Sequence, residues 1–435
     1  MKKKFPSEPF LVELDELHPD GYGLGEFGGR KIAVTGVLPA EKARVQVFSK
    51  RRKLVIARPI EILNPSPDRV ASICSFSDIC GGCSLHHCSS VKQLAYKQSR
   101  LTDEIASCNP GTIMEPLAGP VHGYRRKARL GVKYVEKKAR VLVGFREKGG
   151  KYLAEINACV VLHDSVGERI SELIALIADM DCYRTLPQIE IAVGDDSAAL
   201  VFRHLEPLSA SDFEKLVNFG TQSQLEIYLQ SGGLETVEKI YPSDTEHRLH
   251  YRIPSFDLEM AFHPMDFIQV NQDINLKLID LAVELLDPGP TDEILDLFCG
   301  IGNFSLPLAI GSARILGIEG SSASVQRATE NAQRNNLANA SFQEADLILE
   351  DDNQPWAQSS FNKVLLDPPR SGAWQVVQQL TRSTVSKIVY VSCNPVTLAR
   401  DSRHLVEAGF SLTKAGVIDM FPHTNHVESI VLFER

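Results

Sequence analysis

Alternation of apolar runs with helical stretches is the feature that most constrains the fold of this chain. From about residue 267 onward, runs such as EILDLFC, ARILGIEG, KVLLDPP and KIVYVSC alternate with stretches such as SSASVQRATENAQRNN. This pattern is typical of parallel strands joined by crossover helices. In such sheets a ligand binds outside the carboxyl ends of the strands. The alternation therefore predicts a doubly wound α/β sheet over residues 267–435.

Two different patterns precede this region. Residues 8–65 consist of short alternating apolar runs separated by turn signals such as PDGYGLG, which predicts a small β-barrel of roughly five strands. Residues from about 120 to 266 mix strand and helix patterns, which predicts a central α+β domain. A chain of 435 residues exceeds one ordinary core. We therefore expect three domains, at residues 1–66, 67–266 and 267–435.

Charge is distributed unevenly along the chain, whose formal net charge is −9. Residues 121–151 contain 11 Lys and Arg against two Glu, and the predicted barrel carries a basic turn formed by Lys50, Arg51, Arg52 and Lys53. A local basic face binds phosphates whatever the global sum is. These charges predict an RNA-binding surface, although charged runs can also be simple solvated faces.

The chain shows no sequence signal for export or for a membrane. The start, MKKKFPSEPFLVELDEL, has no apolar run after its basic residues, and no stretch of about 18 uncharged apolar residues follows. The nine cysteines do not form a disulfide framework, and clustered cysteines in a reducing compartment more often bind metal or perform chemistry. We expect a cytoplasmic protein, monomeric and without a membrane partner.

A glycine-bearing turn marks the first predicted ligand contact. The segment DLFCGIGNFS, residues 296–305, follows a buried strand and opens a helix, as in nucleotide-binding turns. Glu319 ends the next strand, where an acidic residue can accept hydrogen bonds from ribose hydroxyls. NAD and S-adenosylmethionine both fit this arrangement. A nicotinamide fingerprint requires a third glycine, but Ser305 occupies that position.

Two further strand ends favour S-adenosylmethionine. Asp367 ends a strand in LLDPPRSG, and two prolines stiffen the turn after it. This segment resembles the motif with which methyltransferases line the junction of cofactor and base. Asp346, at the end of the intervening strand, would lie near the adenine. Each aspartate could instead cap a turn, but the three strand ends in this order favour a methyltransferase.

Cys393 and Glu428 are candidates for covalent catalysis. Carbon 5 of uracil is a poor nucleophile until a thiolate adds to carbon 6 and forms an enolate. Cys393 ends the strand after the one bearing Asp367, and Glu428 begins the last strand, where burial would suit it to proton abstraction. The alternatives are a core cysteine and an exposed strand-start glutamate. Cys299 is a rival thiol, which we expect to pack beneath the glycine loop.

The segments DLFCGIGNFS, DPPRSG, VYVSCNP and HVES, in this order, resemble the RNA uracil-5-methyltransferase family over about the last 170 residues. Cytosine-specific relatives carry a cysteine where this chain has Arg370, which favours uracil. The resemblance implies S-adenosylmethionine as cofactor, Cys393 as the nucleophile and Glu428 as the base. The residues that it implies for the cofactor pocket are Gln269, Phe298, Asn303, Glu319, Asp346 and Asp367.

A separate cysteine group lies in CSFSDICGGC, which contains Cys74, Cys80 and Cys83. A fourth ligand could come from Cys88, His86, His87, Cys108, Cys159 or Cys182. Because only one C-x2-C pair is present, an iron–sulfur cluster is favoured over zinc. The spacing resembles that of the iron–sulfur members of the same family, which implies Cys159 as the fourth ligand of a [4Fe-4S] cluster.

The predicted barrel resembles a TRAM domain, a small RNA-binding module, through DGYGLGEFGGRKIAVTGVLPAEK. A chain with both this module and the cysteine group resembles the 23S ribosomal RNA branch of the family. The expectation is therefore C5 methylation of one uracil in 23S ribosomal RNA. The alternatives are the same reaction on transfer RNA, a non-catalytic RNA-binding assembly factor, and an oxidoreductase, which Ser305 disfavours.

Overall fold

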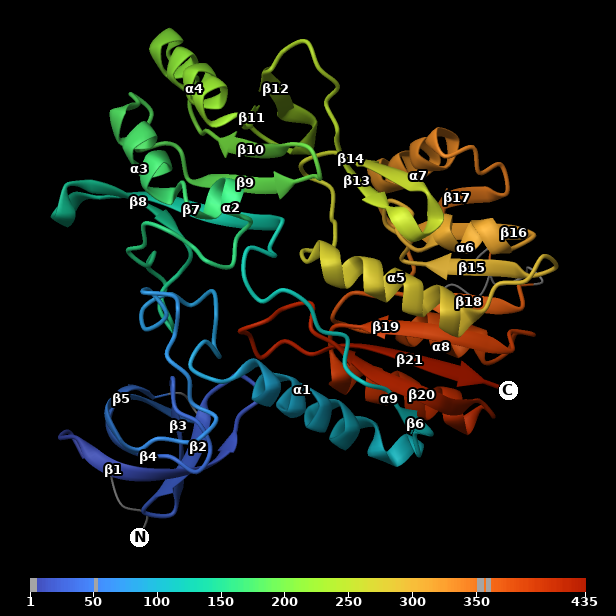
Figure 1. Cartoon of the computed structure of the whole chain (residues 1–435), viewed down its shortest axis with the longest axis horizontal. Helices are drawn as coiled ribbons and strands as arrows, with labels where there is room; N and C mark the ends of the chain where they lie inside the picture. The colour runs from blue at the N-terminus through green and yellow to red at the C-terminus, as the bar shows by residue number, and fades with distance from the viewer. Residues whose placement is uncertain (1–5, 51–53, 350–355, 357–360) are drawn as a thin grey trace.

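The computed structural model describes residues 6–50, 54–349, 356 and 361–435 (Figure 1). The first part is a closed barrel. Its strands are β1 (Phe10–Leu17), β2 (Gly23–Phe27), β3 (Arg30–Val34), β4 (Lys42–Lys50) and β5 (Val55–Asn64). Alternate residues such as Val12 and Leu14 on β1 point inward and fill the interior. The predicted small barrel is confirmed. Of its basic turn, Lys50 ends β4, whereas Arg51, Arg52 and Lys53 lie outside the described residues.

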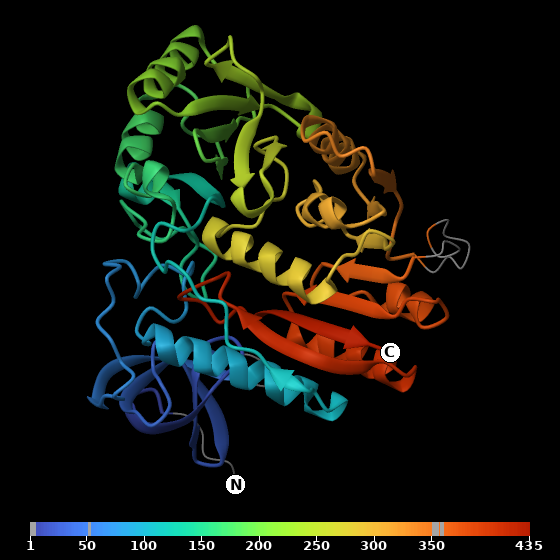
Figure 2. The ribbon, with the colours of Figure 1, turned by 45° about the vertical axis from the view of Figure 1, so that its right-hand side comes forward.

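A connecting segment runs from the barrel along the C-terminal sheet (Figures 1 and 2). It contains α1 (Ser90–Ile105), η1 (Ala106–Cys108) and β6 (Thr112–Ile113). Ser89 caps α1, because its hydroxyl accepts a hydrogen bond from the Lys92 backbone N–H. β6 pairs in parallel with β20 (Ser411–Ile418) and so forms the edge of the C-terminal sheet.

The central region contains a six-stranded sheet in the order β12-β11-β10-β9-β7-β8. Its strands are β7 (Lys127–Val135), β8 (Arg140–Gly144), β9 (Gln188–Val193), β10 (Ala198–Arg203), β11 (Glu226–Gln230) and β12 (Val237–Tyr241), and its helices are η2 (Glu136–Lys138), α2 (Asp164–Gly167), α3 (Ile170–Asp179), α4 (Ala210–Ser223) and η3 (Leu234–Thr236). Leu173 of α3 and Leu216 of α4 are buried in the core that covers this sheet. Parallel pairing occurs between β10 and β11, and antiparallel pairing elsewhere.

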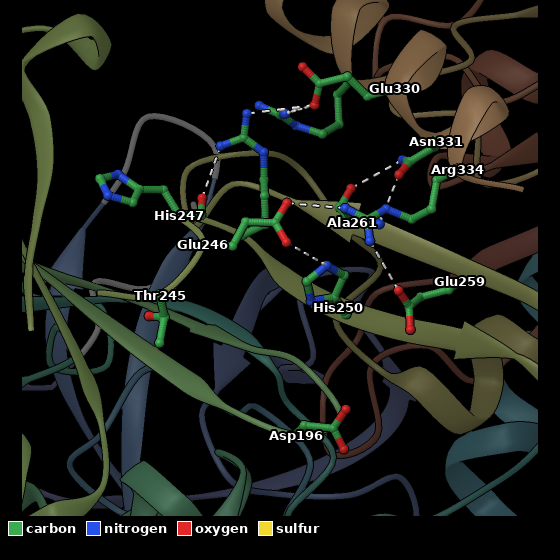
Figure 3. A network of polar contacts seen from close by, with 12 residues as sticks. Asp196, Thr245, Glu246, His247, His250, Glu259, Ala261, Glu330, Asn331 and Arg334 are labelled. Carbon is green, nitrogen blue, oxygen red and sulfur yellow. Dashed lines mark hydrogen bonds and ion pairs between the residues drawn. The ribbon is translucent and has the colours of Figure 1, made fainter. Parts of the chain in front are cut away.

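A two-stranded ribbon joins the central region to the C-terminal sheet. β13 (Leu249–Ile253) and β14 (Leu258–Phe262) are connected through η4 (Pro254–Phe256), and β14 packs on α7 (Ser322–Arg334). Figure 3 shows this junction: the Asn331 amide exchanges two hydrogen bonds with the Ala261 backbone, at 2.8 and 3.1 Å. Arg334 forms ion pairs with Glu246 and Glu259. Asn331 also donates to the Ile301 carbonyl, so the ribbon supports the glycine loop.

The C-terminal region is an eight-stranded sheet in the order β17-β16-β15-β18-β19-β21-β20-β6. Its remaining strands are β15 (Glu293–Leu297), β16 (Arg314–Glu319), β17 (Ala340–Glu344), β18 (Lys363–Leu366), β19 (Lys387–Ser392) and β21 (Glu428–Glu434), and its helices are α5 (Gln272–Leu286), α6 (Ser305–Gly311), α7, α8 (Trp374–Leu380) and α9 (Pro395–Glu407). All neighbours pair in parallel except β21, which is antiparallel to β19 and β20. The predicted doubly wound α/β architecture is confirmed.

Both faces of this sheet are covered. On β19, Val389 and Val391 belong to the core shared with α5, whereas Ile388 and Tyr390 belong to the core shared with α8 and α9. This alternation explains why the strand is a continuous apolar run in the sequence. The strand order reverses between β15 and β18, and in sheets of this type ligands bind outside the carboxyl ends of the strands at such a point. The amino end of the antiparallel β21 lies at the same edge.

Among the described residues, no helix is both long and apolar enough to cross a membrane.

Candidate active site

The glycine loop follows β15 and leads into α6. Gly300 and Gly302 have φ values of +54° and +91°, a region that glycine enters without steric cost. Phe298 also has a positive φ, +66°, which is strained for an aromatic residue. The backbone N–H groups of Phe298 and Cys299 both donate to the Ile318 carbonyl, at 2.9 and 3.1 Å. These bonds hold the loop against β16.

Glu319 lies directly beside this loop at the end of β16. Its carboxylate accepts hydrogen bonds from the backbone N–H groups of Gly300 and Ser321, both at 3.1 Å. The side chain is only half-buried, and a carboxylate has about four acceptor positions. Glu319 can therefore support the loop and still accept hydrogen bonds from a ligand.

Asn303 and Gln269 occupy different positions in the site. The Asn303 amide exchanges hydrogen bonds with Asn275 of α5, at 2.9 and 3.0 Å, and accepts one from the Tyr251 hydroxyl at 2.9 Å. Its polar atoms are therefore engaged within the protein. Gln269 donates to the Asp367 carboxylate at 3.4 Å. Asp346 lies apart from this group, exposed beyond β17, and accepts a hydrogen bond from the Ile348 N–H.

Asp296 is a buried carboxyl that our sequence analysis did not single out. Its side chain is 0% exposed, the Ser305 hydroxyl donates to one of its oxygens at 2.5 Å, and among the described residues its other oxygen has no partner. Burial raises the pKa of Asp296 to about 7, and the nearby carboxyls of Asp367 and Glu319 act in the same direction. An aspartate inside an apolar strand directly before the glycine loop was the available signal.

Cys393 and Glu428 lie side by side on neighbouring strands. The antiparallel register pairs Ser392 of β19 with Ser429 of β21, and the Ser429 hydroxyl donates to the Ser392 carbonyl at 3.1 Å. Cys393 and Glu428 are the next residues at that edge. Asp367, one residue beyond β18, lies at the same edge. The structure thus brings together three residues that are 26 and 35 positions apart in sequence.

Burial shifts the protonation of all three groups. Burial and, to a smaller extent, the Asp367 carboxylate raise the pKa of Glu428 to about 8, against the opposing effect of Arg370. Burial alone raises the pKa of Asp367 to about 7. The pKa of the Cys393 thiol is about 11, because burial, Glu428 and Asp367 all disfavour the thiolate while Arg370 favours it. The free site therefore carries less negative charge than three ordinary groups would at neutral pH.

The start of α9 lies immediately after Cys393. Asn394 caps this helix by accepting a hydrogen bond from the Val396 N–H at 3.2 Å, and Pro395 occupies its first turn. Asn394 also donates to the Arg370 carbonyl at 3.0 Å, which ties the turn after Asp367 to the cysteine. A helix N-terminus stabilises a neighbouring thiolate. Arg370 and a backbone hydrogen bond also favour ionisation of Cys393.

The rival thiol, Cys299, is 4% exposed beneath the glycine loop. A Cβ atom at Gly317 would come within 2.9 Å of its sulfur, so the thiol packs tightly against β16. Burial raises the pKa of this thiol well above its usual value. Cys299 is a packing residue, as its place in the loop predicted.

A second group of thiols lies in the central region. Cys74, Cys80, Cys83 and Cys159 line one cavity of about 130 Å³ together with His86. Burial raises the pKa of Cys83 to about 12, and the other three thiols contribute. Cys88, Cys108 and Cys182 are buried in other cores. In the described part of the chain, no three His, Cys, Asp or Glu side chains are already in ligand geometry.

The basic segment 121–151 is only partly available to a ligand. Arg126 forms an ion pair with Asp195, and Arg129 with Glu190. Lys127 is partly buried and donates to the Pro264 carbonyl, and desolvation lowers its pKa to about 8. Several of the charges that the sequence suggested for RNA therefore have partners within the protein.

Comparison with known proteins gives one family. The family model described as tRNA (Uracil-5-)-methyltransferase matches residues 89–435. A 23S rRNA (uracil(1939)-C(5))-methyltransferase of Alcanivorax borkumensis is 45% identical over 437 residues, covering 100% of this chain and 98% of the relative. The enzyme of the same name from Nitrosococcus oceani is 48% identical over 440 residues, with coverage of 100% and 98%.

Among solved structures, the tRNA (uracil-54, C5)-methyltransferase of Pyrococcus abyssi, in complex with S-adenosyl-L-homocysteine, superposes with a TM-score of 0.75. It is 24% identical, and the match covers 98% of this chain and 100% of that one. This likeness concerns the fold.

Proposed function

Because the chain belongs to the family of RNA uracil-5-methyltransferases, we propose that it methylates C5 of one specific uracil in 23S ribosomal RNA. The reaction is an S-adenosylmethionine-dependent methyl transfer, as in the family. Full-length relatives at 45% and 48% identity carry names that specify 23S ribosomal RNA, which supports this substrate over transfer RNA. Ribosomal RNA as substrate is consistent with a cytoplasmic enzyme, and we propose that it acts as a monomer.

The proposed mechanism rests on one observation: Cys393 and Glu428 lie opposite each other where β19 ends and β21 begins. The Cys393 thiolate adds to C6 of uracil, and the C5–C6 double bond becomes an enolate centred on C5. S-adenosylmethionine would supply the methyl group as a sulfonium, so that the bond from C5 to the methyl group forms as the methyl–sulfur bond breaks. Glu428, as the carboxylate, removes the C5 proton, and the C6–S bond breaks to restore the double bond and the thiolate.

The charges in the site suit this order of reaction steps. A sulfonium placed near Asp367 would favour the carboxylate forms of Asp367 and Glu428, because an opposite charge nearby lowers the pKa of a carboxyl. The free site holds these groups close to neutrality, with pKa values of about 7 and about 8. Cofactor binding would then ionise the base when it is needed.

The cofactor pocket comprises the six residues that the resemblance implied. Gln269 and Asp367, joined by a hydrogen bond, would line the methyl-donor end, and Glu319 would accept from the ribose. Phe298 would contribute its ring, and Asp346 would lie near the adenine. Asn303 would hold the glycine loop in position rather than contact the cofactor through its amide, since Asn275 and Tyr251 form hydrogen bonds with that amide. Asp296, beneath the loop, is a supporting residue.

Cys74, Cys80, Cys83 and Cys159 would hold a [4Fe-4S] cluster. Four thiols around one small cavity are the ligand set that such a cluster needs, one for each iron. Methyl transfer requires no electron transfer, so these residues would serve structure and RNA docking. Protein purified without oxygen should contain iron and sulfide, and the finding of zinc alone would refute this assignment.

The test of the substrate is direct. The protein is incubated with methyl-labelled S-adenosylmethionine and either unmodified 23S ribosomal RNA or unmodified transfer RNA, and the label is mapped. Label at C5 of a single uracil of 23S ribosomal RNA is the expected result. Label only in transfer RNA would favour the alternative substrate, and RNA binding without label would favour a non-catalytic factor.

A further inference from the structure

A second cavity lies where three segments meet: the barrel, the loop that contains Cys80 and Cys83, which we call the cysteine loop, and the turn after β8. Its volume is about 360 Å³, within the range of about 300–1,000 Å³ that is usual for small-ligand pockets. Tyr22 and Phe48 line it from the barrel, Gly82 from the cysteine loop, and Arg146 and Lys148 from the turn. We call this cavity the junction pocket.

Hydrogen bonds hold the walls of the junction pocket in place. The Gly81 N–H donates to the Arg146 carbonyl at 2.8 Å, and the Lys148 N–H donates to the Ile79 carbonyl at 2.9 Å. On the opposite side, Asn425 donates to the Pro19 carbonyl at 2.6 Å and exchanges hydrogen bonds with the Ser84 hydroxyl. The pocket is therefore preformed from segments that lie far apart in the sequence.

The chemistry of the pocket combines flat rings with donors and acceptors. Phe48 is 45% exposed, and Phe145 forms part of the same lining. Among the described residues, the side chains of Arg146 and Lys148 have no hydrogen bond and no ion pair within the protein. Two carboxylates, Asp20 and Glu147, also line the cavity, so it does not suit a bare phosphate.

We propose that the junction pocket binds one unstacked nucleotide of the RNA substrate, distinct from the uracil that meets Cys393. This inference rests on the proposed function, which supplies the RNA. Aromatic rings stack on any base, cations contact its phosphate, and carboxylates accept hydrogen bonds from exocyclic amines. The pocket offers all three: Phe48 for stacking, Arg146 and Lys148 for the phosphate, and Asp20 and Glu147 for the base edge.

The position of the pocket connects RNA binding to both other sites. Gly82, Cys83 and Phe145 line the junction pocket and also the cavity of the four thiols, so one wall is shared. Asn425 lines the pocket three residues before Glu428. A nucleotide in the pocket would thus contact the loop that leads to the proposed base.

Steady-state methyl transfer with a fragment of the RNA substrate tests the proposal. Phe48→Ala should raise KM for RNA by about 5- to 100-fold, which is the loss of one base–aromatic stack, with a smaller effect on kcat. Tyr152→Ala is the matched control, since Tyr152 is a 67% exposed aromatic on the neighbouring turn outside the pocket lining. An unchanged KM for Phe48→Ala, or an equal increase in both variants, would overturn the proposal.

Ultraviolet cross-linking of the wild-type protein to RNA provides a readout that does not depend on a variant. Mass spectrometry should find nucleotides attached to the peptides that contain Phe48 or Phe145, whereas cross-links confined to other peptides would overturn the proposal. The two proposals fail separately. Cross-linking at Phe48 without methyl transfer would refute the proposed function alone, and methyl transfer with wild-type KM in Phe48→Ala would refute the pocket alone.

Discussion

At the scale of single residues, the site has to produce a thiolate and a carboxylate where burial favours their neutral forms. Arg370 opposes this effect, because its positive charge lowers the pKa of both Cys393 and Glu428. Its guanidinium contacts the Nδ1 atom of His426 at 2.7 Å. Burial and Arg370 lower the pKa of His426 to about 4, so this imidazole is neutral and its lone pair can accept the hydrogen bond.

Removal of the thiol should stop the reaction at its first step. Cys393→Ala should lose methyl transfer by several orders of magnitude, because the thiol that adds to C6 is gone, and should still bind S-adenosylmethionine. Filter binding with labelled cofactor and RNA methylation measure the two properties. Cys299→Ala, which removes the rival thiol, should still form the covalent adduct with RNA. Turnover by Cys393→Ala would exclude this residue as the nucleophile.

Removal of the base should stop the reaction after methyl transfer. In Glu428→Gln the C5 proton stays in place, so the C6–S bond cannot break and methylated RNA should accumulate attached to the protein. Denaturing gels with labelled cofactor detect this adduct as a shifted band. Normal turnover without an adduct would remove Glu428 from the mechanism.

The pH dependence of the rate follows from the base. A carboxyl with a pKa of about 8 in the free site is mostly protonated at pH 7, so the rate at cofactor concentrations well below saturation should rise as pH increases toward 8–9. Arg370→Ala should move this rise to higher pH, because Arg370 lowers the pKa of both groups. Arg403→Ala, an exposed arginine on α9, is the control and should leave the profile in place. A wild-type profile in Arg370→Ala would contradict this account.

At the scale of elements, the catalytic residues lie at one edge of the C-terminal sheet, whereas much of the basic segment lies on β7 and β8 of the central sheet. β7 carries Arg129 paired with Glu190 of β9, and Lys133 exposed beyond that pair. Among the described residues, Lys133 and Lys137 have no ion-pair partner. A charge already paired within the protein contributes less to phosphate binding than a free one does. We therefore expect the basic residues of this segment to contribute unequally to the affinity for RNA.

The salt dependence of RNA affinity should distinguish these charges. Each lysine that contacts a phosphate contributes about 1 to the slope of log affinity against log salt. The double variant Lys133→Ala/Lys137→Ala should reduce the slope by up to about 2, and Arg129→Ala by less than 1. Titration of RNA with each variant at several salt concentrations measures the slope. A larger effect of Arg129→Ala would reverse the ranking drawn from the ion pairs.

At the scale of the whole molecule, α1 connects the barrel and the cysteine loop to the loop before β21. The Lys97 side chain, 0% exposed, donates to Asp419 at 2.6 Å and to the Phe421 carbonyl at 2.9 Å. Gln93, also on α1, accepts a hydrogen bond from the His423 N–H at 2.8 Å. The loop that leads to Glu428 thus depends on a helix more than 300 residues earlier in the chain.

Breaking the buried pair should be costly. Lys97→Met leaves the Asp419 charge buried without its partner, which should lower the free energy of unfolding by about 3–5 kcal/mol. Lys92→Met removes an exposed pair with Asp68 and should cost less than about 1 kcal/mol. Urea unfolding at pH 7 measures both. A change below about 1 kcal/mol for Lys97→Met would show that this pair does not anchor the loop.

The sequence by itself determined the α/β alternation, the small barrel and the order of the motifs, because strand, helix and turn preferences depend on residues close together in the chain. It also singled out Cys393 and Asp367, since each follows an apolar run that is typical of a buried strand. The position of the glycine loop, with Cys299 beneath it, was likewise readable from local pattern.

Only the tertiary structure decided which of these residues meet. The antiparallel insertion of β21 sets Glu428 beside Cys393, and the fold brings Cys159 to a cavity shared with cysteines some 80 positions earlier. The same contacts pair Arg126 and Arg129 with acids, engage the Asn303 amide, and leave Asp296 buried. Burial and long-range pairing set these charges and pKa values, and no local pattern encodes a contact between residues so far apart.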